Sequence, residues 1–177
     1  MLIKARHCVG GQGKQVENWK DEIIYYNNIP ELYLIWEKKD YLNQITVELI
    51  KKIENIEFDF MLTVESKGII FASPIANYFR KPIVIIQKKW NLPESIKKIE
   101  KDITNWRNEE ETLYLNLTNI KPKQRYIFLD DVIQTKSTIK SCIEIIKESG
   151  SEIIEIYCIA NITTEKEFNG IKIHSLL

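Results

Sequence analysis

The sequence predicts an α/β fold in which helices cover both faces of a parallel sheet. Short apolar runs of strand length alternate along the chain with stretches in which apolar residues recur at helical spacing. Strands buried on both faces read as continuous apolar runs, as Phe60–Val64 and residues 127–129 do. A chain of 177 residues fits a single domain, here 1–177, and can bury a core.

The elements follow in chain order. Val47, Ile50, Ile53 and Ile56 fall on one helical face, which indicates a helix over 47–56 that leads into the first core strand. Gly150 is typical of the residue that follows a helix end. The other expected helices lie near residues 68–80 and 137–149. Strands are expected near residues 58–64, 82–87, 112–117, 125–130, 152–160 and 171–174.

Residues 88–111 form the longest stretch without a convincing apolar period. The charged run at 94–102 is compatible with a helix framed by loops. Long loops inside compact domains are usually lids, binding loops or disordered segments. We therefore expect a lid at 88–111, and a surface excursion without a role is the alternative.

Residues 126–138 carry most of the functional information. An apolar run ends in two adjacent carboxylates, Asp130 and Asp131, and a hydroxyl-rich turn then leads into a helical pattern that begins at Ile139. A helix that starts after a strand can bind a phosphate with its unpaired backbone N–H groups. Carboxylates beside it can accept hydrogen bonds from the vicinal hydroxyls of a ribose. The segment thus suits a ribose phosphate.

Three other interpretations of this segment were considered. The carboxylates could simply be a solvated strand end, or charges favoured by a helix dipole. The residues 135–138, Thr-Lys-Ser-Thr, are similar to a nucleotide-binding P-loop, but that loop needs glycines where this chain has Asp130 and Thr135. An aspartyl-phosphate receiver also has acids at strand ends, but its acid pair lies near the start of the chain.

Two upstream segments favour the ribose phosphate. A second apolar strand is followed by Glu65-Ser-Lys-Gly68, and a third by residues 87–93, Gln-Lys-Lys-Trp-Asn-Leu-Pro. In this order, and over about residues 58–160, the three segments resemble adenine phosphoribosyltransferases and their xanthine-specific relatives, which are type I phosphoribosyltransferases. The second segment is similar to a turn that binds pyrophosphate, and the third to the start of a mobile catalytic loop.

The resemblance implies the parallel-sheet fold of that family, with a small N-terminal hood at 1–40, an α/β core at 41–160 and a closing strand segment at 161–177. It implies that Asp130 and Asp131 hold the ribose hydroxyls of 5-phosphoribosyl-1-pyrophosphate (PRPP). Mg²⁺ would be bound through PRPP rather than by protein ligands. The implied phosphate-binding residues are Thr135, Lys136, Ser137 and Thr138 for the 5′-phosphate, and Ser66, Lys67 and Lys88 for the pyrophosphate.

This chain departs from the family pattern at several places. Lys136 and Ser137 stand where the family has small residues, usually glycine. Trp90 and Asn91 replace a Gly-Lys pair, and the Glu-Tyr-Gly of adenine enzymes is not evident near Arg107. We therefore expect transfer of phosphoribose from PRPP to a purine-like base. A weakly active or inactive protein of this fold that senses PRPP or a nucleotide is the alternative.

The hood region is strongly aromatic between residues 19 and 36. These aromatic side chains could stack on a flat heterocyclic base or could form the core of a small subdomain.

The composition of the chain limits the kinds of partner and compartment to be expected. Lys+Arg and Asp+Glu both number 25, so no basic field favours nucleic acid. Three cysteines, Cys8, Cys142 and Cys158, suggest a reducing compartment, with the last two buried in helix and strand. No apolar run approaches a membrane span. We expect a cytoplasmic homodimer that binds PRPP and a nucleobase-like molecule, without membrane or nucleic-acid partners.

Overall fold

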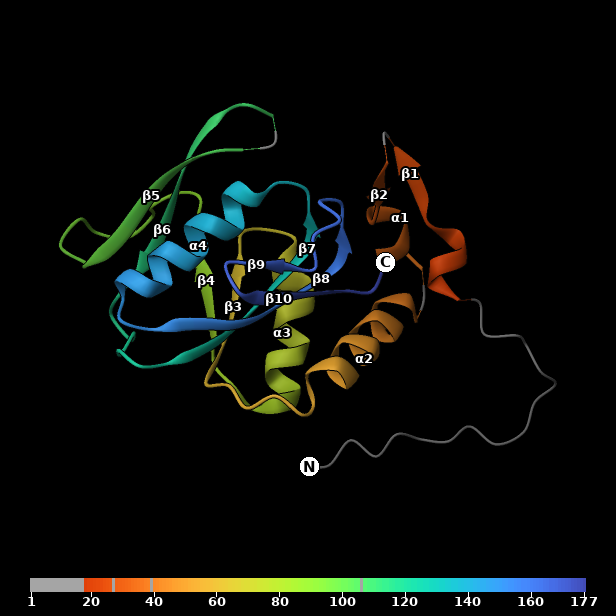
Figure 1. The fold of residues 1–177 in the computed structure, drawn as a ribbon, viewed down its shortest axis with the longest axis horizontal. Coiled ribbons are helices and arrows are strands. Elements are labelled where there is room, and N and C mark those ends of the chain that lie inside the picture. Colours follow the sequence, from red (N-terminus) through yellow and green to blue (C-terminus); the bar gives the residue numbers. More distant parts are fainter. Residues whose placement is uncertain (1–17, 27, 39, 106) are drawn as a thin grey trace.

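The computed structural model describes residues 18–26, 28–38, 40–105 and 107–177. Within them, a six-stranded sheet has the order β4-β3-β7-β8-β10-β9 (Figure 1). The pairs β3–β4, β3–β7, β7–β8 and β8–β10 are parallel, and only the short β9 is antiparallel. The predicted parallel sheet is therefore confirmed. Its strands are β3 (Phe60–Val64), β4 (Ile83–Ile86), β7 (Arg125–Ile133), β8 (Glu152–Asn161), β9 (Glu167–Phe168) and β10 (Ile171–Ser175).

Alternating residues of the central strand β7 enter two separate cores. Ile127 and Leu129 pack with α2 (Tyr41–Ile53) and α3 (Gly68–Phe79), whereas Tyr126 and Phe128 pack with α4 (Lys136–Glu148). Successive side chains of a strand point to opposite faces, so a fully apolar run can fill both cores. Figure 1 shows α2 and α3 apart from α4, with the sheet between them. The predicted helices at 68–80 and 137–149 are confirmed within two residues.

The first helix differs from the prediction in extent and face. Helix α2 begins at Tyr41 rather than at 47, and its buried face is Tyr41, Ile45, Leu49 and Ile53. Val47, which was assigned to the apolar face, is 39% exposed. The expected window started in mid-helix, so it missed the first two turns, whose i, i+4 spacing defines the buried stripe.

The strand predicted near 112–117 is confirmed as β6 (Glu110–Asn116), but it lies outside the parallel sheet, and the possible helix at 94–102 is wrong. Strand β5 (Lys98–Thr104) pairs antiparallel with β6 (Glu110–Asn116) in a separate two-stranded sheet. A parallel strand at 112–117 would need a crossover connection, whereas five residues between β5 and β6 allow only a hairpin. The charged residues of β5 hid its alternation, because only Ile99 and Ile103 mark the buried face.

The hairpin is packed on α4 and is joined to the main sheet. Its apolar residues Ile99, Ile103, Leu113 and Leu115 are buried in the same core as Ile145. Gln87, directly after β4, exchanges two backbone hydrogen bonds with Tyr114 of β6, at 2.9 and 2.8 Å. The part of the predicted lid that forms β5 is thus packed in the folded core, and a mobile lid stays a prediction.

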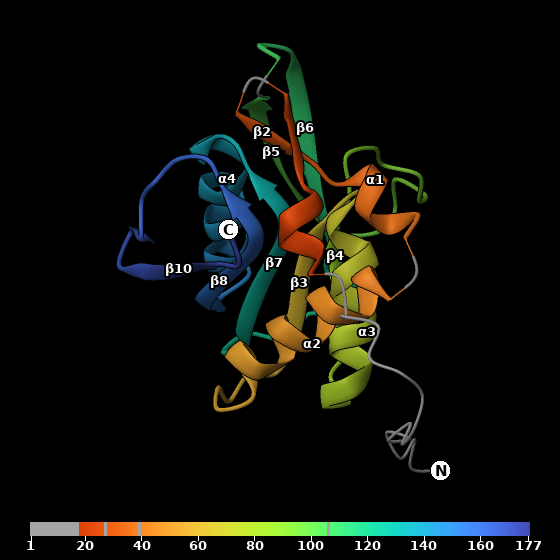
Figure 2. The same ribbon diagram turned by 90° about the vertical axis from the view of Figure 1, so that its right-hand side faces the viewer.

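The described part of the hood consists of η1 (Trp19–Glu22), the short strands β1 (Ile24–Tyr26) and β2 (Ile29–Glu31), and α1 (Tyr33–Trp36). The hood is fixed to α2, because the buried Trp19 indole donates a hydrogen bond to Glu48, at 2.8 Å. In Figure 2 the hood strands and the hairpin both rise above the same edge of the sheet. The rest of the predicted hood, residues 1–17, lies outside the described residues.

The predicted burial of Cys142 and Cys158 is confirmed. Cys142 in α4 and Cys158 in β8 are buried free thiols, whereas Cys8 lies outside the described residues. Burial raises the pKa of both thiols, which keeps them protonated and unreactive. Across the described residues, no helix is both long and apolar enough to cross a bilayer.

The hairpin's contribution to the core can be measured with Leu113→Ala. Leu113 is fully buried in β6, so its truncation should lower the free energy of unfolding by about 2–5 kcal/mol. Urea unfolding of this variant is compared with Thr104→Ala, on the exposed side of β5, which should change it by less than about 1 kcal/mol. Equal small effects would show that the hairpin detaches without cost.

Candidate active site

A cavity of about 600 Å³ lies at the edge of the sheet where β3 and β7 end. Three parts of the chain that are far apart in sequence form most of its walls: the hood, the turn at residues 65–68, and the stretch from the end of β7 to the start of α4. The hairpin tip adds Arg107. Ligands of parallel α/β sheets bind outside the carboxyl ends of the strands, so this is the expected place for a site.

Gly68 brings the turn at 65–68 against β7. A Cβ at this position would lie 2.3 Å from Thr63 Oγ1, 3.0 Å from Asp130 Oδ1 and 3.2 Å from the Leu129 carbonyl oxygen. Only glycine allows the start of α3 to approach both strands so closely. The glycine of the Glu-Ser-Lys-Gly turn therefore places the turn directly beside the carboxylate pair. The Glu65–Ser66 peptide within this turn is cis.

Asp130 and Asp131 both line the cavity, but they lie within β7 rather than at its end. The strand continues to Ile133, because Val132 and Ile133 go on pairing with β8. Asp130 is partly buried and its Oδ1 accepts the backbone N–H of Asp131, at 2.9 Å. It is therefore not the solvent-facing strand end that the sequence suggested.

The two carboxylates interact unfavourably. Burial first, and then the negative charge of Asp131, raise the pKa of Asp130 well above its usual range, while Lys88 acts in the opposite direction. A carboxyl group in this state binds a proton tightly when the cavity holds no cation or hydroxyl donor. The pair is thus suited to receive donors from a ligand.

The hydroxyl turn, residues 135–138, is brought to the cavity only in part. Thr135 and Thr138 line the cavity, and Thr135 Oγ1 is 2.9 Å from Ser137 Oγ. Lys136 and Ser137 are not among the lining residues. The Lys136 ammonium pairs instead with Glu165, in the loop after β8. The lysine ammonium therefore points away from the cavity in this structure.

The predicted pyrophosphate residues Ser66, Lys67 and Lys88 all line the cavity. The Lys67 ammonium lies 4.3 Å from the ring centroid of Tyr33, which belongs to the hood. The Lys88 ammonium is 3.1 Å from a Glu111 oxygen of β6, and its backbone N–H donates to Glu65 at 2.9 Å. Lys67 therefore connects the turn to the hood, and Lys88 connects it to β6.

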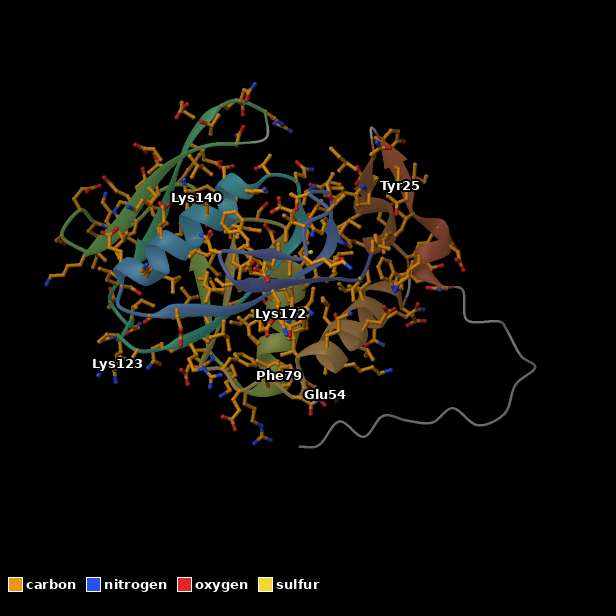
Figure 3. The ribbon with its side chains drawn as sticks, in the orientation of Figure 1. Tyr25, Glu54, Phe79, Lys123, Lys140 and Lys172 are labelled. Carbon is orange, nitrogen blue, oxygen red and sulfur yellow. The ribbon has the colours of Figure 1, made fainter. Side chains whose placement is uncertain are left out.

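The aromatic hood residues divide between the core and the cavity wall. Trp19 is fully buried in the core with α2, so it is structural. Tyr26 and Tyr33 are 63% and 51% exposed and line the cavity, where flat rings could stack on a heterocycle. Tyr25 is also exposed and is labelled on the hood in Figure 3.

The comparisons with known proteins agree with this geometry. The family described as "Phosphoribosyl transferase domain" matches residues 37–170. The chain belongs to this family. It is therefore a phosphoribosyltransferase, an enzyme of the pentosyltransferase class.

Related proteins and structures resemble this phosphoribosyltransferase along most of its length. An adenine phosphoribosyltransferase of Caldicellulosiruptor bescii is 24% identical over 153 residues, covering 82% of this chain and 86% of the relative. The Giardia lamblia enzyme complexed with 9-deazaadenine has a TM-score of 0.75 at 17% identity, covering 90% of this chain and 97% of that one. The Trypanosoma brucei enzyme, in complex with AMP, pyrophosphate and ribose-5-phosphate, has a TM-score of 0.71 at 21% identity, covering 82% and 67%. These structures show the same fold.

Sequence reasoning missed several residues of this cavity. Glu31 of β2 and Gln134 line it, but neither belongs to a recognisable motif. Arg107 was noted only as the residue where a family carboxylate is absent. Glu165, the partner of Lys136, is 29 positions away in sequence, and nothing local signals such a pair.

The close approach at Gly68 gives a paired test. Gly68→Ala should destabilise the enzyme by about 1–3 kcal/mol and displace Asp130, because the new methyl group has no space. Thr63→Ala removes the nearest obstructing atom and should restore part of the loss in the double variant. Thermal unfolding of the four proteins provides the measurement. A fully tolerated Gly68→Ala would show that the turn is not held against β7.

The raised pKa of Asp130 predicts a pH-dependent stability. The folded enzyme binds this proton more tightly than the unfolded chain does, so the stabilisation is present at low pH and is lost as pH rises toward the native pKa. Asp130→Asn should therefore be more stable than the wild type at about pH 8, with the difference shrinking toward about pH 4. Urea unfolding across pH measures this, with the exposed Asp21→Asn as control. A difference that grows on acidification would contradict the assignment.

Proposed function

We propose that this phosphoribosyltransferase transfers 5-phosphoribose from PRPP to adenine, releasing pyrophosphate and forming AMP. The observation that carries the proposal is the single cavity that joins the carboxylate pair, the hydroxyl turn, the turn at 65–68 and the hood. Relatives from Caldicellulosiruptor bescii and Mycoplasmopsis pulmonis, 24% and 25% identical to this chain, are named adenine phosphoribosyltransferases. Solved enzymes of the same fold hold 9-deazaadenine, or AMP with pyrophosphate and ribose-5-phosphate.

The groups that line the cavity support one assignment of the substrate's parts. Asp130 and Asp131 accept hydrogen bonds from the ribose hydroxyls. The hydroxyl turn, at the start of α4, receives the 5′-phosphate through side-chain hydroxyls and backbone N–H groups. Lys67 and Lys88 face the pyrophosphate, and the exposed rings of Tyr26 and Tyr33 leave the hood side for the base.

The reaction builds positive charge at the anomeric carbon and negative charge on the leaving pyrophosphate. Lys67 and Lys88 offer two cations where the leaving-group charge develops, and hydrogen bonds to charged groups are the strong ones. The carboxylate pair lies beside the ribose and favours positive charge there. The hood and Arg107 of the hairpin tip line the cavity, where closure over a bound substrate would keep water from the reacting carbon.

Magnesium fits this donor set as an ion carried by the substrate. Among the described residues, no group of three or more His, Cys, Asp or Glu side chains could hold a metal. The carboxylate oxygens of Asp130 and Asp131 are hard donors of the kind that Mg²⁺ accepts alongside water and phosphate oxygens. Mg²⁺ bound through PRPP would supply further neutralisation of the pyrophosphate charge.

The hood offers one feature that suits an amino-substituted base. Glu31 lines the cavity, and one of its oxygens accepts the backbone N–H of Tyr33, at 2.8 Å. Its second carboxylate oxygen can accept a hydrogen bond from an exocyclic amine, whereas an oxo group in the same place would be repelled. Adenine has the amine and hypoxanthine has the oxo group.

The decisive experiment measures pyrophosphate release with PRPP and Mg²⁺ against adenine, hypoxanthine, guanine and xanthine. Adenine should be the preferred acceptor. A different preferred base would overturn the adenine assignment and leave the phosphoribosyltransferase activity. A PRPP-dependent thermal shift without release for any base would indicate the alternative function, a sensor of PRPP.

The carboxylate pair provides the matched variant. Asp130→Asn with Asp131→Asn should weaken PRPP binding by at least tenfold, because losing one hydrogen bond between charged partners costs roughly 1.5–3 kcal/mol. Calorimetry with PRPP and Mg²⁺ tests this in a protein whose thermal unfolding shows that it is folded. Unchanged affinity would remove both residues from the ribose site.

A homodimer and a cytoplasmic location belong to the same proposal. Light scattering coupled to size exclusion measures the oligomeric state directly, and a monomer at the concentrations used for activity would contradict the dimer.

A further inference from the structure

The ion pair between Lys136 and Glu165 joins the proposed phosphate site to a neighbouring loop. Lys136 is the first residue of α4, and its ammonium contacts a carboxylate oxygen of Glu165, between β8 and β9. Both side chains are partly open to solvent, 49% and 42% exposed. The ammonium is thus drawn away from the cavity that Thr135 and Thr138 line, although it remains attached to the same turn.

The loop that presents Glu165 is organised by Asn161. The Asn161 amide donates to the Glu165 carbonyl oxygen at 2.6 Å, and its side-chain oxygen accepts the Thr163 N–H at 3.1 Å and hydroxyl at 2.7 Å. The Ile162 N–H donates to the carbonyl of Ile133, at the end of β7. Glu165 is therefore held beside the turn by a folded loop, rather than reaching it as a flexible surface side chain.

The energetics make this pair easy to exchange. A cation at the first position of a helix is disfavoured by the helix dipole, and the Glu165 carboxylate offsets that repulsion. Exposed ion pairs are weak, because solvent and salt screen them. A phosphate dianion at the N-terminus of α4 carries more charge than a carboxylate and presents three acceptor oxygens to the same ammonium.

We propose that Lys136 exchanges Glu165 for the 5′-phosphate when PRPP binds, and that Glu165 recaptures the ammonium when the nucleotide product leaves. This inference rests on the proposed function for the identity of the phosphate. Lys136 is then a phosphate-binding residue. At this position the family usually has a small residue, and backbone N–H groups alone bind the phosphate. Glu165 is a positioning residue that acts only through Lys136 and competes with the ligand.

The central experiment is a double-variant cycle read by calorimetry with ribose 5-phosphate, which has the 5′-phosphate but no pyrophosphate and no base. Glu165→Gln should tighten binding by roughly two- to fivefold, the range that an exposed pair supports. Lys136→Ala should weaken binding by a similar or larger factor. In the Lys136→Ala background, Glu165→Gln should have no effect, because there is no ammonium to release.

Two control variants separate this exchange from general electrostatics. Lys140→Ala removes the same charge one turn further along α4, at the exposed position labelled in Figure 3. Glu167→Gln removes a carboxylate from an exposed position two residues beyond Glu165. Both should leave affinity for ribose 5-phosphate within experimental error of the wild type.

Enzyme kinetics supply a second readout. Glu165→Gln should lower both the KM for PRPP and the inhibition constant for AMP, without raising kcat, because the ligand no longer competes with the carboxylate. A Glu165→Gln variant that binds ribose 5-phosphate more weakly, or one that tightens it equally with and without Lys136, would overturn the exchange. Since no base is needed for calorimetry, a failure to transfer phosphoribose to adenine would refute the proposed function alone.

Discussion

The site depends on one close approach, that of Gly68 to β3 and β7. A glycine at the first position of α3 lets the helix start lie against Thr63, the Leu129 carbonyl and Asp130 at once. Without it, the turn that bears Ser66 and Lys67 would be pushed away from the carboxylate pair. Because Gly68 has no side chain, the turn can pack closely against β7. This packing, rather than a residue that contacts a ligand, determines the distance between the proposed pyrophosphate and ribose positions.

The charged groups around the cavity are paired before any ligand arrives. Lys88 pairs with Glu111, Lys136 with Glu165, and Lys67 lies against the Tyr33 ring. The two carboxylates of β7 are the exception, because they repel each other and raise the pKa of Asp130. Binding a highly charged substrate thus replaces existing contacts of the lysines, while it relieves an existing repulsion between the acids. The second effect displaces no side-chain partner, although a donor to Asp130 must compete with the proton that its raised pKa favours.

Much of the core could be predicted from sequence because its signals are local. Continuous apolar runs predicted strands β3 and β7, and Gly150 predicted the C-terminal end of helix α4. The hairpin was missed because Lys98, Glu100 and Asp102 occupy the exposed face of β5 and obscure its two buried isoleucines. In the site, the motif residues were brought together as expected, except that Lys136 and Ser137 do not line the cavity. The position of Lys136 depends on its contact with Glu165, 29 residues away, which no local pattern encodes.

Helix α4 forms an ion pair at each end, and in both cases the charge on the helix residue is the one that the helix dipole disfavours. Lys136 stands at the positive end and pairs with Glu165, while Glu148 stands at the negative end and pairs with Lys101 of the hairpin, at 3.3 Å. Each terminal charge subtracts from the field of the helix, so the attraction that this helix exerts on a distant anion is reduced. Its selectivity for phosphate must then arise at contact range. Salt weakens the ion pairs at both ends of the helix, which frees Lys136 for a ligand. Salt also weakens the long-range attraction of the anionic ligand, so the two effects on binding oppose each other.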